Sequence, residues 1–188
     1  MSQCIYNTYW NASATPPGPI LEAGQPKIFY LGGNTNIDPC GKNTGTWTSL
    51  KEEGMLNAGS SGIGGIVDNF STANPAISSS PVSISDGIWI KSGLAASLYR
   101  DAKECSATGD KRCQFVTIPV VANAEANASP TEAEVTAFAC IEILNGTQGG
   151  SGSDKNTIKV RMTRSCDPPG SGGIGPDYGF KPRPRIVQ

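Results

Sequence analysis

The sequence contains no histidine among its 188 residues. This absence excludes catalytic triads that use a histidine base, histidine-ligated metal sites and the C-x-x-C-H haem motif. Charged residues make up only 16% of the chain and aromatic residues only 7%, whereas Gly, Ser, Asn, Thr and Pro are abundant. Such a composition favours short strands joined by long polar loops over bundles of helices.

Neither a charge excess nor a long apolar run is present. The 15 Lys and Arg residues oppose 16 Asp and Glu residues, so the net charge of −1 offers no basic surface to a nucleic acid. The basic cluster KPRPR at 181–185 is interrupted by prolines and is interpreted as part of a solvated tail. The polar, proline-rich beginning of the sequence fits neither a signal peptide nor a membrane segment.

The cysteines are even in number, and none are in C-x-x-C spacing. This pattern indicates a disulfide framework rather than a zinc or thioredoxin-like site, and hence an oxidising compartment. We therefore expect an extracellular, cell-surface or periplasmic protein whose export signal or membrane anchor precedes this sequence. The residues expected to form disulfides are Cys4, Cys40, Cys105, Cys113, Cys140 and Cys166.

The pairing of these cysteines stays open, with one expected bridge and one unfavourable one. Cys105 and Cys113 flank a short polar loop, CSATGDKRC, and form the expected local bridge. A hairpin that is symmetric about Asn145-Gly146 places Cys166 opposite Val135, roughly 17 Å along the strand from Cys140. A Cys140–Cys166 bridge is therefore not expected.

Three apolar segments late in the chain are the expected core of the fold. The segments 113–121 (CQFVTIPVV) and 134–144 (EVTAFACIEIL) are rich in β-branched residues without helical spacing, so they predict buried strands. The segment 156–166 alternates, which predicts one face in the core and one face in water. The core face carries Ile158, Val160 and Met162, and the water face carries Lys159, Arg161 and Thr163. Asn145-Gly146 predicts the turn of the hairpin between the last two strands.

The whole pattern predicts a mainly β fold, an antiparallel sheet or sandwich-like core with one or two short helices, long Gly/Pro/Ser-rich loops and disulfide staples. A single β-rich domain is expected at 27–166, between a Pro/Gly-rich arm at 1–26 and a Pro/Gly-rich tail at 167–188. Earlier strands are predicted at 27–33, 45–50 and 87–91, and the helices near 57–70 and 94–105.

No catalytic set or cofactor motif is found, so a non-enzymatic protein is expected. The glycine-rich stretch 59–67 has Val67 in the third glycine position of G-x-G-x-x-G and lacks the Gly-Lys-Ser/Thr of a P-loop. Among the carboxylates, only Glu142 lies within an apolar strand, and we interpret it as the partner of Arg161 or Lys159 across the hairpin. The other carboxylates weighed for glycosidase chemistry are Glu52, Glu53, Asp86, Glu132, Glu134 and Asp154. No metal is expected, because the loop residues Asp38, Asp68, Asp154 and Asp167 lack the spacing of a calcium loop.

The order of the strand motifs resembles the C-terminal region of TadE/TadG-like proteins of bacterial tight-adherence (Tad/Flp) pili. In that family an IPV strand is followed by a GFa-type strand and a glycine-led final strand, after a W…L segment, a helix and a "Gd-i…G" segment. The corresponding stretches here are TGTWTSL (44–50), ISDGIWIKSG (84–93), IPVV (118–121), TAFACIEI (136–143) and SGSDKNTIKVRM (151–162). Ala137 stands where the family often has glycine.

The resemblance implies a bacterial envelope or extracellular protein that acts in pilus assembly or surface attachment through binding and architecture. Its expected partners are other pilus or cell-surface proteins, further copies of itself, or a glycan surface. Two alternatives stay open. One is a carbohydrate-binding module that stacks sugars on exposed aromatic rings, for which the candidate platforms are Trp10, Trp47, Trp89 and Tyr178. The other is a filament-forming surface subunit whose polar termini exchange or wrap between copies.

Overall fold

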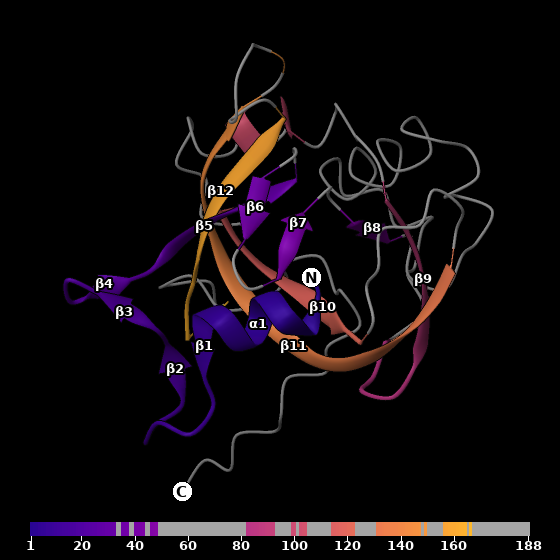
Figure 1. Cartoon of the computed structure of the whole chain (residues 1–188), viewed down its shortest axis with the longest axis horizontal. Helices are drawn as coiled ribbons and strands as arrows, with labels where there is room; N and C mark the ends of the chain where they lie inside the picture. Colours follow the sequence, from indigo (N-terminus) through magenta and orange to yellow (C-terminus); the bar gives the residue numbers. More distant parts are fainter. Residues whose placement is uncertain are drawn as a thin grey trace, which may run out of the picture.

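A computed structural model of the chain describes residues 1–32, 35–37, 40–43, 46–48, 82–92, 99–100, 102–104, 114–122, 131–147, 149, 156–164 and 166. The fold is mainly β and antiparallel, as the sequence predicts (Figure 1). The elements are α1 (Gln3–Tyr9), β1 (Trp10–Asn11), β2 (Gly18–Pro19), β3 (Leu21–Glu22), β4 (Gln25–Pro26), β5 (Ile28–Gly32), β6 (Thr35–Ile37), β7 (Gly41–Asn43), β8 (Thr46–Thr48), β9 (Gly87–Ser92), β10 (Phe115–Val121), β11 (Thr131–Thr147) and β12 (Thr157–Met162).

The strands predicted at 27–33, 45–50 and 87–91 correspond to β5, β8 and β9 and are confirmed. Part of the helix predicted near 94–105 is also confirmed, because residues 99–100 and 102–104 are helical. The helix predicted near 57–70 and the tail at 167–188 lie outside the described residues, so both stay predictions.

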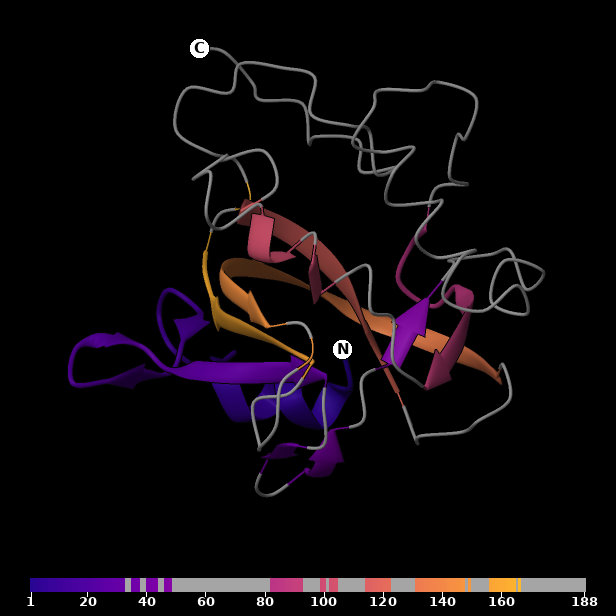
Figure 2. The same ribbon diagram turned by 90° about the horizontal axis from the view of Figure 1, so that it is seen from above.

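The long strand β11 organises the main sheet, whose strand order is β5-β12-β11-β9-β8, with β10 also paired to β11. The beginning of β11 pairs with β9, its middle with β10 and its end with β12. Figures 1 and 2 show β11 as a long curved ribbon that spans the sheet. Two register shifts leave Thr136 and Leu144 as extra residues in β11. Such bulges bend a strand and increase its twist, which accounts for the curvature.

The shift at Thr136 also moves the apolar side of β11 from one face of the sheet to the other. The neighbours Val120 and Val121 of β10 are both buried but belong to different hydrophobic clusters, because consecutive strand residues point to opposite faces. The first cluster comprises Ile5, Tyr9, Phe29, Tyr99, Ala102, Val120, Ala139, Ile141, Ile158, Val160 and Met162. The second comprises Val82, Ile88, Ile90, Val121, Ala133 and Val135. The core is therefore built on both faces of the sheet.

The alternation predicted for β12 is confirmed. Ile158, Val160 and Met162 are buried in the first cluster, whereas Lys159 and Arg161 remain half-exposed.

The predicted turn at Asn145-Gly146 is wrong, because both residues lie inside β11 and pair with Lys159 and Ile158. Gly146 is buried, and a Cβ atom placed on it would lie 2.5 Å from the carbonyl oxygen of Tyr99 and 2.6 Å from the backbone nitrogen of Lys103. The helical residues 99–100 and 102–104 thus approach the strand at a point where only glycine leaves room. Close backbone packing, rather than a turn conformation, explains this glycine.

The same register overturns the prediction that Cys140 and Cys166 do not pair. These residues form a disulfide with a Cα–Cα distance of 5.4 Å. Asn145 pairs with Lys159, three residues further along the chain than the partner in the symmetric hairpin. The backbone nitrogen of Thr163 consequently donates to the carbonyl oxygen of Cys140 at 3.0 Å, and Cys166 lies only three residues beyond. The predicted Cys105–Cys113 bridge lies outside the described residues.

Candidate functional site

The N-terminal segment is held against the sheet at both of its ends. Ser2 caps helix α1, since its hydroxyl accepts a hydrogen bond from the backbone nitrogen of Ile5 at 3.3 Å. The α-amino group of Met1 donates to the carbonyl oxygen of Pro119 in β10 at 2.8 Å, and burial lowers its pKa from 8.0 to about 5. Ile5 and Tyr9 are buried in the first hydrophobic cluster. The start of the region predicted as an arm therefore forms part of the core.

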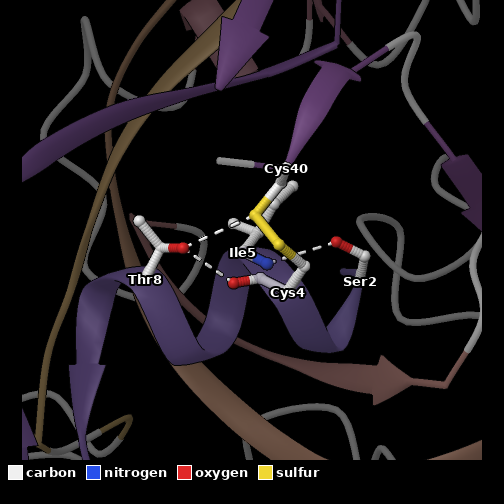
Figure 3. The surroundings of a disulfide bond; sticks show 5 residues. All are labelled: Ser2, Cys4, Ile5, Thr8 and Cys40. Carbon is white, nitrogen blue, oxygen red and sulfur yellow. Dashed lines mark hydrogen bonds between the residues drawn. A yellow bond between two sulfur atoms is a disulfide. The ribbon is translucent and has the colours of Figure 1, made fainter. Parts of the chain in front are cut away.

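A disulfide between Cys4 and Cys40 joins α1 to the residue that precedes β7, with a Cα–Cα distance of 5.7 Å (Figure 3). The hydroxyl of Thr8 donates to the carbonyl oxygen of Cys4 at 2.9 Å and lies 3.4 Å from the sulfur of Cys40. The helix is thus joined to the start of β7 by the disulfide bond and by the contact of the Thr8 hydroxyl with the sulfur of Cys40.

The tyrosine ring of Tyr9 connects α1 to the sheet and to the hairpin that follows. It stacks on Phe29 with a centroid distance of 4.2 Å. The ammonium of Lys27, which lies between β4 and β5, is 5.7 Å from the centroid of the Tyr9 ring. Burial, with a further contribution from the Glu22 carboxylate, raises the pKa of Tyr9 above its ordinary value of 10.0. Both effects disfavour the ionised phenolate in the folded chain.

Stability is therefore expected to fall as pH rises above about 10, because the unfolded chain ionises Tyr9 at its ordinary pKa while the folded chain resists ionisation. Melting temperatures of the wild type and Tyr9→Phe at about pH 9, 10 and 11 measure this effect, since the variant keeps the ring and loses the titrating hydroxyl. The melting temperature of the wild type should fall relative to that of Tyr9→Phe as pH rises. A difference between the two melting temperatures that does not change with pH contradicts a raised pKa for Tyr9.

The four candidate ligand platforms do not form one surface among the described residues. Trp10 is half-buried and stacks on Tyr6 with a centroid distance of 6.1 Å and an interplanar angle of 24°. Trp89 is half-buried in β9, which lies on the opposite side of the molecule from β1 (Figures 1 and 2). Trp47 is placed only by its backbone, in β8 opposite Lys91. Tyr178 lies outside the described residues. Sequence reasoning missed Tyr6, although its i, i+4 spacing to Trp10 is the signal for such a pair on a helix.

A polar cluster lies on the side of β12 that faces away from the first hydrophobic cluster. Glu142 is 8% exposed, and one of its oxygens accepts a hydrogen bond from Arg161 Nε at 2.6 Å. Its other oxygen accepts from Gln114 Nε2 at 2.9 Å. The predicted pairing of Glu142 with a cation across the hairpin is thereby confirmed for Arg161, whereas Gln114 had no signal in the sequence.

Three of the remaining candidate carboxylates, Glu132, Glu134 and Asp86, lie in the part of the chain that the structure describes. Glu132 and Glu134 are exposed on β11, and Asp86 accepts a hydrogen bond from the backbone nitrogen of Ser83 at 2.8 Å. No group of three or more His, Cys, Asp or Glu residues that could hold a metal ion occurs among the described residues. None of the described helices is long and apolar enough to cross a membrane. Glu52, Glu53, Asp154 and the loop residues Asp38, Asp68 and Asp167 lie outside the described residues.

No family model, curated protein or solved structure matches this chain. We base the functional proposals on two features of the described residues: the sheet with its disulfides, and the polar cluster around Arg161.

Proposed function

We propose that the chain is a non-enzymatic structural or adhesive module of a bacterial cell surface, associated with a Tad-type pilus in assembly or attachment. The observation that carries the proposal is the pair of disulfides, Cys4–Cys40 and Cys140–Cys166. They are compatible with an oxidising, extracellular or periplasmic location. The order of strand motifs that resembles TadE/TadG-like proteins supports the pilus association.

The compartment is tested by the thiol state of the protein isolated from its native host. We expect the intact mass of the non-reduced protein to show no free thiol at the four paired cysteines, and a thiol-alkylating reagent to leave the folded protein unmodified. Free thiols in the folded protein would contradict an extracellular or periplasmic location.

The role is tested by deleting the gene in its host. We expect the deletion strain to lose surface attachment or surface pili, and complementation with the intact gene to restore them. Unchanged attachment together with unchanged pili would contradict the proposal.

A carbohydrate-binding module is the alternative that an observation favours. The half-buried Tyr6–Trp10 pair presents neighbouring aromatic rings, and aromatic faces are the surfaces on which sugars stack. Loss of glycan binding in Trp10→Ala, with the disulfides intact, would support this alternative.

A further inference from the structure

Arg161 is oriented by a buried carboxylate but is not saturated by it. The hydrogen bond between Arg161 Nε and Glu142 uses one of the five N–H donors of the guanidinium. Neither Nη nitrogen of Arg161 donates a hydrogen bond within the part of the chain that the structure describes. The Arg161 side chain is 32% exposed, whereas that of Glu142 is 11% exposed. Glu142 therefore fixes the Nε side of the guanidinium, while the two Nη nitrogens remain available to a ligand.

Gln114 supports the orientation of Arg161 indirectly, by a hydrogen bond to Glu142. Because Gln114 Nε2 binds the second oxygen of Glu142, neither carboxylate oxygen is left to turn away from the arginine. A guanidinium that is already held in place loses less rotamer entropy when it binds a ligand. This arrangement is preorganised for planar, two-point recognition of an anion.

The charges on the face of β12 that carries Lys159 and Arg161 suit a ligand group with a single negative charge. Lys159 lies two residues before Arg161 on the regular strand β12, so both side chains point to the same face. Among the described residues of β11 and β12 on this face, the two cations and the anion Glu142 together leave a net charge of +1. A carboxylate neutralises this charge, whereas a phosphate dianion would leave an excess negative charge beside Glu142.

The surroundings favour a saccharide over an extended peptide as the carrier of that carboxylate. Strand β12 is paired with β11 on one side and with β5 on the other, so its backbone offers no free edge to a peptide strand. On β5, Ile28 lies opposite Arg161 and is 42% exposed, and the half-buried Tyr30 lies opposite Lys159. These side chains add an apolar and aromatic border to the two cations, which suits the apolar side of a sugar ring.

We propose that Arg161 and Lys159 bind the carboxylate of an acidic saccharide, with Arg161 as the two-point contact and Ile28 and Tyr30 beside the sugar ring. This inference rests on the proposed adhesive role, for which it names a ligand class. Glu142 and Gln114 are positioning residues that act through Arg161.

The test is calorimetric titration of the full chain with a hexamer of α-1,4-linked galacturonate. We expect binding by the wild type and loss of binding when the carboxylates of the hexamer are methyl-esterified. Arg161→Lys keeps the charge beside Glu142 but removes the planar fork, and it should raise the Kd about tenfold or more. Arg164→Lys is the matched control: Arg164 lies three residues along, is exposed, and binds the carbonyl oxygen of Pro16, so this variant should keep the wild-type Kd.

Four outcomes overturn the inference. They are failure of the wild type to bind the hexamer, equal binding of the native and the methyl-esterified hexamer, a Kd for Arg161→Lys that is no higher than the Kd for Arg164→Lys, and equal or tighter binding of a hexaglutamate peptide. The comparison of native and methyl-esterified hexamer uses only the wild type, so it decides the matter even if Arg161→Lys fails to fold. A wild type that restores attachment to the deletion strain but binds no galacturonate leaves the proposed function standing and removes only this ligand.

Discussion

Gly146→Ala is expected to lower the free energy of unfolding by about 2–3 kcal/mol. The added Cβ would lie 2.5 Å from the carbonyl oxygen of Tyr99 and 2.6 Å from the backbone nitrogen of Lys103. Both atoms belong to the backbone of helical residues, so neither can move aside by a change of rotamer. The helical segment would have to shift away from β11, which would loosen the packing of Tyr99 and Ala102 in the first hydrophobic cluster.

Urea-induced unfolding followed by circular dichroism measures the change. Gly18→Ala is the matched control, because it places the same methyl group on a strand glycine whose nearest neighbour is the guanidinium of Arg164. That side chain is exposed, and moving it aside costs at most its hydrogen bond to the carbonyl oxygen of Pro16, so the control should unfold within about 1 kcal/mol of the wild type. Equal stability of Gly146→Ala and the wild type would show that the helical segment does not lie against Gly146.

Replacing both Cys4 and Cys40 by serine is expected to lower the free energy of unfolding by about 4 kcal/mol. The disulfide closes a loop with a sequence separation of 36 residues, and its removal restores the entropy of that loop to the unfolded chain. The seven-residue helix α1 is too short to be stable by itself. Its side chains Ile5 and Tyr9 should consequently leave the core more often in the variant.

Two measurements separate the loss of global stability, caused by the added entropy of the unfolded chain, from the local opening of helix α1. Urea unfolding gives the total, and hydrogen exchange of the α1 amides reports whether the helix opens without global unfolding. The Cys140→Ser/Cys166→Ser variant is the matched control, since its disulfide closes a loop of similar length, with a separation of 26 residues. The control should lose about 3–4 kcal/mol but keep local protection of α1 close to that of the wild type. Equal loss of α1 protection in both variants would contradict a clamp specific to Cys4 and Cys40.

The residues of β12 show why part of the candidate site could be predicted. A strand has a period of two, so the alternation of Ile158, Val160 and Met162 with Lys159 and Arg161 assigns their faces without any knowledge of the partners. A carboxylate in an apolar strand needs a counter-ion, and Lys159 and Arg161 on the water face of the next strand are the candidates for that role. The sequence therefore predicts either cation as the partner of Glu142, and the register of β12 selects Arg161.

The segment around Asn145 could not be predicted correctly from the sequence. Asn-Gly is a strong local signal for a hairpin turn, and local chemistry alone does not reveal that a helical segment presses on the glycine. Relative to the symmetric hairpin, the pairing is shifted by three residues at Asn145 and, because Leu144 is an extra residue, by two residues at Ile141. This shift places Thr163 beside Cys140, which forms a disulfide with Cys166. Helix α1 escaped prediction for a related reason, because seven residues carry too little periodicity and the helix depends on its cap, its disulfide and the core.

The sequence by itself determined the mainly β class, the disulfide framework, the two faces of β12 and the choice of Arg161 or Lys159 as the counter-ion of Glu142. Each of these follows from side-chain chemistry repeated at short range along the chain. Only the tertiary structure decided the register of β11, the bulge at Thr136 that divides the core between two faces, the pairing of the described cysteines and the contact of Gln114 with Glu142. These features depend on the packing of segments far apart in the sequence, where the summed burial of many side chains outweighs any single local preference.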